Sequence, residues 1–97
     1  MAQLFVLEWR FPPERAARLE VRPRHRVFLE QLRAQGRLVA AGPWSDDSGA
    51  LIILEAEDAA EVERLLEADP YVRERVGGER LLREWVPFIG GTIEASG

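Results

Sequence analysis

One histidine occupies the apolar face of a predicted helix. His25 is the only histidine in the chain, and it follows Val21 by four residues and precedes Phe28 by three. Leu29 and Leu32 continue this spacing, which is typical of a helix face that packs against a core. An imidazole at such a position is either a hydrogen-bonded core side chain or a proton-transfer group held in a pocket. Periodicity alone favours the core interpretation.

Asp69 is the second ionisable residue on a predicted apolar helix face. It follows Leu65 by four residues and Leu66 by three. A carboxylate beside a histidine fixes the tautomer of the ring and stabilises the imidazolium ion, so the two residue types form a general-base unit. Aspartate followed by Pro70 is also a common start of a new helical turn, which explains Asp69 without any chemistry.

The predicted helices hold these two side chains apart. His25 falls near the start of one helix, and Asp69 falls at the end of another that runs parallel to it. Roughly ten residues of helix separate those two ends by about 15 Å. His25 and Asp69 therefore meet only if the loop after the second helix folds back, or if a partner subunit contributes one of them.

The composition excludes several other kinds of site. The 97-residue chain contains no cysteine, so disulfides, thiolate metal sites and cysteine nucleophiles are excluded. All 13 basic residues are arginine, which excludes a Schiff-base lysine and a P-loop lysine. No histidine and carboxylate pair has metal-ligand spacing. We therefore expect neither a metal nor an organic cofactor.

Charge and hydropathy favour a cytoplasmic protein. The net charge is −4, and the arginines alternate with acids, which argues against nucleic acid as a partner. No apolar run approaches the ~20 residues that cross a bilayer, and no signal-peptide pattern opens the chain, so no membrane association is expected. The length predicts a single domain over residues 1–97, with a core over about 3–88 and a C-terminal tail over 89–97.

The order of the predicted elements indicates a ferredoxin-like α+β fold. Strands are predicted over 3–9, 37–44, 50–55 and 79–88, and helices over 23–35 and 59–68, the second capped by Asp58. With right-handed crossovers, this βαββαβ order gives a four-stranded, antiparallel-containing sheet of order 4-1-3-2. Pro43 and Pro87 fall in the two edge strands, where a missing backbone N–H is tolerated.

The two central strands are apolar on both faces, although two helices cover only one face of such a sheet. The runs Leu4–Leu7 and Leu51–Leu54 show this pattern. An uncovered apolar patch of this size usually marks an interface. The sequence therefore predicts a homodimer in which two sheets pack face to face.

Four short segments stand in a characteristic order and spacing over about residues 4–88. They are Arg22-Pro23 followed by His25, Gly36-Arg37-Leu38 leading to Ala41-Gly42-Pro43, Ser48-Gly49-Ala50 before an apolar strand, and Ala68-Asp69-Pro70-Tyr71-Val72. Together they resemble the YciI-like (YCII-related) domain family. This resemblance implies a dimeric α+β barrel in which His25 and Asp69 match the family's proposed catalytic residues.

One characterised branch of this family resembles a dehydrochlorinase that acts on a chlorinated hydroxyquinol. The chain departs from the family pattern at two places. Arg73-Glu74-Arg75 stands where the family often has a small residue and a glycine, and Gly49-Ala50 stands where Gly-Ser is frequent. Both places lie near the expected pocket mouth, so no relative's substrate is transferred to this chain.

Three functional hypotheses follow. In the first, a small enzyme uses His25 as general base or acid for proton abstraction, isomerisation or elimination on a small oxygenated, cyclic substrate. Asp69 orients His25, Arg22 holds an anionic group, and Trp44 and Tyr71 form pocket walls. In the second, the same barrel is a ligand-binding or accessory module without turnover. In the third, it handles haem with His25 as axial ligand.

Overall fold

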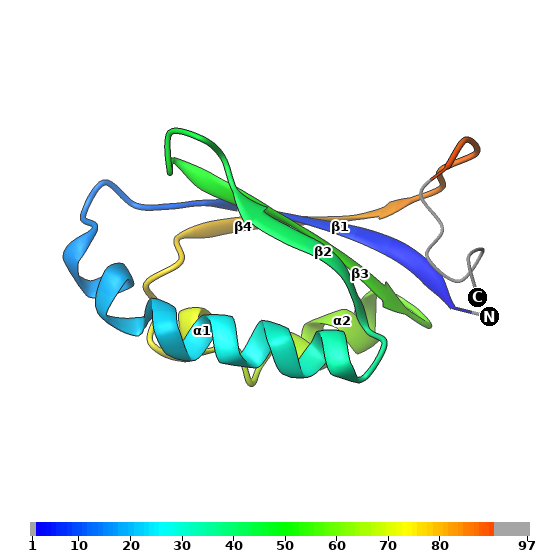
Figure 1. Cartoon of the computed structure of the whole chain (residues 1–97), viewed down its shortest axis with the longest axis horizontal. Coiled ribbons are helices and arrows are strands. Elements are labelled where there is room, and N and C mark those ends of the chain that lie inside the picture. The colour runs from blue at the N-terminus through cyan, green and yellow to red at the C-terminus, as the bar shows by residue number, and fades with distance from the viewer. Residues whose placement is uncertain (1, 91–97) are drawn as a thin grey trace.

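Strands and helices alternate along the chain in a computed structural model that describes residues 2–90 (Figure 1). The strands are β1 (Gln3–Arg10), β2 (Leu38–Pro43), β3 (Gly49–Ala56) and β4 (Glu79–Trp85). The helices are α1 (Ala16–Ala34), α2 (Ala59–Leu66) and the short α3 (Pro70–Arg73). The predicted βαββαβ order is confirmed, with α3 as an addition. The end of the predicted tail, from residue 91, lies outside the described residues.

The four strands form one sheet of order β2-β3-β1-β4, in which every neighbouring pair is antiparallel. Leu7 of β1 lies opposite Ile52 of β3 and Leu82 of β4, so these three side chains share one face. The helices lie against this face, below the sheet in Figure 1. The predicted ferredoxin-like α+β topology is confirmed.

The edge strand β2 includes its proline, whereas the edge strand β4 ends before its proline. Pro43 is the last residue of β2, where its missing N–H removes no bond from the interior of the sheet. β4 ends at Trp85, so Pro87 lies beyond it, and the predicted extension of this strand to residue 88 is wrong. A residue without an N–H cannot continue the hydrogen-bond ladder, which is consistent with a strand that stops before it.

The start of α1 is the largest difference from the prediction. α1 begins at Ala16, so Pro23, which was expected near the first turn, lies inside the helix. An interior proline removes one backbone hydrogen bond and costs about 3 kcal/mol. Burial of one helix face offsets this cost; its buried residues are Arg18, Val21, His25, Phe28 and Leu32. His25 therefore lies in the middle of α1.

Aspartates begin both of the later helices. The side chain of Asp58 accepts a hydrogen bond from the backbone N–H of Glu61 at 2.8 Å, as predicted for the start of α2. α2 ends at Leu66, and the chain then turns back, with the N–H of Asp69 bound to the carbonyl of Leu66 at 3.0 Å. α3 begins at Pro70, has Asp69 as its N-cap and packs against α1.

The core fills the space between the sheet and the helices. Its most completely buried apolar side chains come from both layers and include Leu7, Trp9, Ile52, Leu54, Val62 and Leu66. None of the helices within residues 2–90 has the length and hydropathy needed to cross a lipid bilayer.

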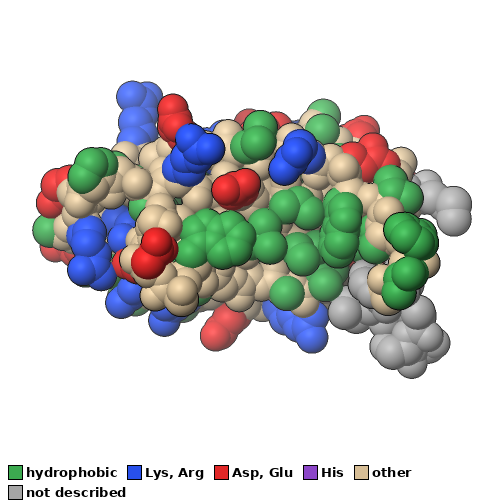
Figure 2. Space-filling model, turned by 90° about the horizontal axis from the view of Figure 1, so that it is seen from above, with side chains coloured by type: hydrophobic (Ala, Val, Ile, Leu, Met, Phe, Trp, Pro, Cys, Tyr) green, Lys and Arg blue, Asp and Glu red, His purple; other side chains and the backbone are tan. Residues whose placement is uncertain are grey.

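The opposite face of the sheet is apolar and carries no helix from the described part of the chain. Val6 of β1 lies opposite Ile53 of β3, and both point to this face, as do Leu51, Leu81 and Trp85. Leu81 is 54% exposed and Trp85 is 41% exposed. Figure 2 shows an apolar band across this surface, with arginines and acids beside it. We call this surface the open face.

Candidate active site

The side chains of His25 and Asp69 are in direct contact. Nδ1 of His25 lies 2.8 Å from Oδ1 of Asp69, and the two residues are 6% and 0% exposed. The separation of about 15 Å that was expected from two parallel helices is therefore wrong. His25 lies in the middle of α1, and the turn after Leu66 brings the start of α3 back against α1. The contact is made within one chain because this loop folds back.

A single oxygen of Asp69 holds both the histidine and the helix start. Oδ1 accepts from Nδ1–H of His25, and it also accepts from the backbone N–H of Tyr71 at 2.9 Å. The other oxygen, Oδ2, is enclosed and has no hydrogen-bond partner within residues 2–90. Asp69 is thus the cap of α3 and the partner of His25 at the same time.

This contact determines which ring nitrogen of His25 is left for other partners. An ionised carboxylate only accepts hydrogen bonds, so Nδ1 carries the proton in this pair. In the neutral ring, Nε2 then keeps a free lone pair. Nε2 makes no hydrogen bond to any residue in the range 2–90, and His25 lines a cavity. The arrangement leaves one basic nitrogen for a molecule in that cavity.

Tyr71 holds the plane of the histidine ring. The two rings are parallel within 1°, with centroids 3.7 Å apart. Trp9 and Phe11 contact Tyr71 edge-on from other sides, so the stack has little room to rotate. Burial raises the pKa of the Tyr71 phenol above its usual 10.0, and the guanidinium of Arg18 acts in the opposite direction. Tyr71 is therefore a neutral, fixed wall beside His25.

The cavity next to His25 has a volume of about 540 Å³ and lies between α1, β2 and β3. Apolar side chains such as Leu29, Leu38 and Ile52 form part of its lining. Charged side chains form another part: four arginines (Arg18, Arg22, Arg26, Arg33) and two acids (Glu30, Asp47). The lining therefore carries an excess of positive charge, although the chain as a whole is acidic.

Two of the three predicted substrate-contacting residues lie in this lining. Arg22 is half-buried on α1, and Tyr71 lies beside His25. Trp44 is 40% exposed on the turn between β2 and β3, where its ring packs close to Gly49. The structure does not place Trp44 among the residues that line the cavity.

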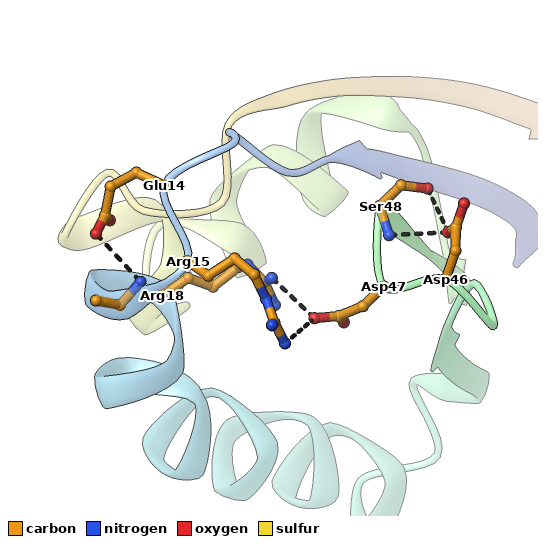
Figure 3. Close-up of polar contacts among 7 residues, drawn as sticks. Glu14, Arg15, Arg18, Asp46, Asp47 and Ser48 are labelled. Atoms are coloured by element: carbon orange, nitrogen blue, oxygen red, sulfur yellow. Dashed lines mark hydrogen bonds and ion pairs between the residues drawn. The ribbon is translucent and has the colours of Figure 1, made fainter.

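Arg18 is a lining residue that the sequence did not reveal as a candidate. It is 1% exposed, and its guanidinium carbon lies 3.9 Å from the centre of the Phe11 ring. Its Nη2 donates to Oδ2 of Asp47 at 3.0 Å, and Arg15 reaches the same oxygen at 3.0 Å. Figure 3 shows Arg18 of α1 and Arg15, the residue before α1, both extending to Asp47 on the turn between β2 and β3.

Arg18 precedes residue 23, where the first helix was predicted to begin, so it was not placed on a helix face. The available signal was the continuation of the helical spacing through Arg18, Val21 and His25, in steps of three and four residues. Within residues 2–90, no group of three or more histidine, aspartate or glutamate side chains could hold a metal ion.

Comparison with known proteins identifies the family. The YCII-related domain matches residues 4–86, a range that contains the whole His25 and Asp69 arrangement. The chain belongs to this family. The resemblance predicted from the four short segments is thereby confirmed.

The sequence relatives of this YCII-related protein align with it over only part of each chain. YjpA of Bacillus subtilis (strain 168) is 36% identical over 61 residues, which are 63% of this chain and 71% of YjpA. YciI of Escherichia coli O6:H1 (strain CFT073) is 40% identical over 65 residues, which are 57% of this chain and 66% of YciI. The match to YciI thus spans slightly less than two thirds of that protein.

Solved structures agree with the fold. The 5-chloro-2-hydroxyhydroquinone dehydrochlorinase TftG of Burkholderia phenoliruptrix AC1100, in complex with 2,5-dihydroxybenzoquinone, has a TM-score of 0.74 and 26% identity, covering 86% of this chain and 93% of TftG. PA3566 of Pseudomonas aeruginosa has a TM-score of 0.61 and 16% identity, covering 90% of this chain and 94% of PA3566. The likeness to PA3566 shows the fold alone.

Proposed function

We propose that this YCII-related protein is a cofactor-independent cytoplasmic enzyme in which His25 moves a proton on a small, oxygenated, cyclic substrate. The reaction class is proton abstraction, isomerisation or elimination. Nε2 of His25 takes a proton from the substrate. The electron pair left behind moves to a neighbouring carbonyl as an enolate, or it expels a leaving group such as chloride.

The contact between His25 and Asp69 carries this proposal. A core histidine that serves only packing needs partners for its polar atoms, whereas here Nδ1 is bound and Nε2 is left at a cavity. The buried carboxylate sets the tautomer and stabilises the imidazolium ion that forms when Nε2 takes a proton. These features correspond to a general base held in position before the substrate arrives.

The similarity to TftG supports the reaction class. TftG is a dehydrochlorinase, and its structure was solved with 2,5-dihydroxybenzoquinone. A flat ring with oxygen substituents suits the cavity of this chain, because Tyr71 offers a fixed aromatic wall and arginines offer positive charge. In the proposal, Asp69 orients His25, and Arg22 and Tyr71 contact the substrate.

The test measures proton transfer and leaving-group release. Wild type and His25→Gln are assayed for chloride release from 5-chloro-2-hydroxyhydroquinone and for solvent deuterium exchange into a panel of cyclic hydroxyketones and quinols. We expect His25→Gln to lose about 10²–10⁴-fold of the rate, because glutamine keeps the contact with Asp69 but is no base. Added imidazole should restore part of the rate to His25→Ala.

Two results would contradict the proposal. One is a His25→Gln variant that stays folded and keeps the wild-type rate. The other is unfolding of both His25→Gln and His25→Ala, which would make His25 a core residue. If wild type binds the panel compounds saturably without exchange or release, and His25→Gln binds them equally well, the protein is instead a ligand-binding module.

We also propose that two copies of the chain pack together through the open face. Its apolar band has no cover from the described helices, and Val86, Phe88 and Ile89 extend the exposed apolar surface beyond β4. A monomer would leave this surface in water, at a cost that grows with the exposed apolar area. A second copy of the same face provides a matching apolar surface.

The dimer is tested by light scattering coupled to size-exclusion chromatography. Leu81→Asp places a charge on the open face, and Val27→Asp places one on α1 at the same exposure, 54% against 55%. We expect a wild-type dimer, a monomeric Leu81→Asp variant and a dimeric Val27→Asp variant. A monomeric wild type at micromolar concentration would rule the dimer out.

A further inference from the structure

Arg18 is a buried charge whose hydrogen bonding is incomplete. Only 1% of the residue is exposed, and its Nε has no hydrogen-bond partner within residues 2–90. The face of the guanidinium lies over the Phe11 ring, with its carbon 3.9 Å from the ring centre. A buried guanidinium N–H without an acceptor is unusual, because the loss of its water is then not compensated.

Asp47, the acidic partner of Arg18, occupies only part of the hydrogen-bonding edge of the Arg18 guanidinium. Nε and Nη2 form the edge of a guanidinium that binds two adjacent oxygens side-on. Asp47 occupies Nη2 through Oδ2 and leaves Nε empty. The same oxygen of Asp47 also accepts a hydrogen bond from Arg15, so it is shared by the two arginines. An anion with two adjacent oxygens would complete the edge better than Asp47 does.

Asp47 comes from a segment that lies apart from the helix it contacts. It is on the turn between β2 and β3, its side chain is 26% exposed, and its backbone φ is 62°. Figure 3 shows its carboxylate extending from the turn to the two arginines, while Asp46 turns the other way and binds Ser48. Asp47 is therefore a negative group that reaches Arg18 from the solvent side.

The position of Arg18 links this pair to the candidate active site. Arg18, Asp47 and His25 all line the same cavity, and Tyr71 contacts His25 while its phenol is within the influence of Arg18. An anion bound at Arg18 would therefore share the cavity with Nε2 of His25. The arginine excess in the lining favours a negatively charged occupant.

We propose that Arg18 is the anion-binding residue of this cavity, that its ligand is an anionic ring with two adjacent oxygens, and that Asp47 occupies the place of that anion until the ligand displaces it. This inference rests on the proposed function for its substrate class. It adds a residue that selects an anionic substrate and a carboxylate of the protein that competes with it.

The test measures affinity for two quinones by calorimetry and by visible absorbance. 2,5-Dihydroxybenzoquinone ionises at neutral pH and presents adjacent oxygens, whereas 2,5-dimethoxybenzoquinone is neutral. We expect wild type to prefer the anionic quinone. Arg18→Gln should bind it about tenfold to a hundredfold more weakly, since a bond to a charged group is lost, while binding of the neutral quinone stays unchanged.

Asp47→Asn should bind the anionic quinone several-fold more tightly than wild type does. Asparagine tolerates the positive φ at this position, so the substitution removes the charge and keeps the turn. Asp46→Asn is the matched control, because it removes the same charge from the same turn without touching Arg18. Arg24→Gln is the control for Arg18, because Arg24 is an exposed arginine of α1 outside the cavity lining.

Several outcomes would overturn the inference. The first two are equal binding of the anionic quinone by wild type and Arg18→Gln, and an affinity of Asp47→Asn for this quinone that is unchanged or weaker. The other two are a gain in affinity in Asp46→Asn equal to that in Asp47→Asn, and no binding to wild type at millimolar quinone. If Arg18→Gln fails to fold, the comparison of Asp47→Asn with Asp46→Asn decides alone. Failure of the proposed function is recognised separately, because it is measured as turnover in His25→Gln and not as affinity.

Discussion

At one end of the cavity an aspartate is sealed against a histidine, and at the other end an aspartate reaches an arginine from an exposed turn. The closed end consists of His25, Asp69 and Tyr71, where Asp69 is fully buried and Tyr71 is 2% exposed. His25 of α1 contacts both Asp69, the N-cap of α3, and Tyr71 of α3, and the two helices pack against each other. These side chains have one arrangement, because packing and hydrogen bonds restrict them together.

The turn end consists of Arg15, Arg18 and Asp47, and only Arg18 is buried. Asp47 is held by hydrogen bonds to arginines and not by packing, so water and solutes compete for the same groups. The difference indicates that a ligand meets a rigid group at the closed end and an adjustable one at the turn end. Rigidity suits a proton-transfer group, which needs a fixed geometry, and adjustability suits recognition of a ligand.

The largest expected effect is a loss of stability when the contacts at the closed end are removed. Asp69→Ala should lower the free energy of unfolding by about 3–5 kcal/mol, because it removes one partner of a buried pair as well as a helix cap. Asp58→Ala, which removes the cap of α2 at an exposed site, should cost about 1 kcal/mol. Urea unfolding of the two variants gives the comparison. Equal losses would mean that Asp69 is no more than a cap.

Amide hydrogen exchange compares the two ends, because each has a backbone N–H that donates to an aspartate side chain. The N–H of Tyr71 binds Oδ1 of Asp69 at 2.9 Å, and the N–H of Ser48 binds Oδ1 of Asp46 at 3.0 Å. Both bonds span two residues, but only the first is buried. We expect the Tyr71 amide to exchange at least about a hundredfold more slowly, since buried units open less often. Similar rates, measured by NMR and corrected for sequence, would show that the closed end opens as readily as the turn.

A smaller effect is expected when the charge at the turn end is removed. Asp47→Asn should lower the free energy of unfolding by about 0.5–1 kcal/mol, the usual range for an ion pair in contact with solvent. The amide oxygen of asparagine still accepts from Arg18, which limits the loss. Thermal or urea unfolding measures it. A loss as large as that of Asp69→Ala would show that the turn end is also part of the packed core.

The smallest effect depends on pH. The hydrogen bond from Arg18, followed by the charge of Arg18, lowers the pKa of Asp47 below its usual 3.8. A lowered carboxylate pKa stabilises the fold above the unfolded-state value, and this contribution is lost as pH falls through 3.8 towards the folded-state pKa. The stability difference between wild type and Asp47→Asn should therefore be present at neutral pH and shrink as the pH falls below 3.8. A difference that stays constant with pH would contradict the ion pair.

Strand order and the buried face of α1 could be predicted from the sequence because both follow from short-range patterns. The apolar runs around Leu7 and Ile52 identify central strands, and the spacing from Val21 to Leu32 identifies the helix face. The order β2-β3-β1-β4 then follows from right-handed crossovers. Local hydropathy and chain topology contain this information, so no knowledge of side-chain packing is needed.

The sequence named His25 and Asp69 as a pair but left open whether and how they meet, because the contact depends on where helices begin and turn. Pro23 indicates a helix start by its own preference, and only the burial of the α1 face as a whole permits it inside the helix. The same misplaced start left Arg18 outside the predicted helix. Trp44 was predicted as a pocket wall; in the structure it is 40% exposed on the turn between β2 and β3 and is not among the residues that line the cavity.

The shared oxygen of Asp69 joins two events that are separate in many proteins. Because Oδ1 accepts from both the Tyr71 N–H and the His25 ring, the atom that caps α3 is also the atom that orients the imidazole. Any signal that adjusts this cavity in the folded protein must act elsewhere, and the turn that carries Asp47 is the accessible place.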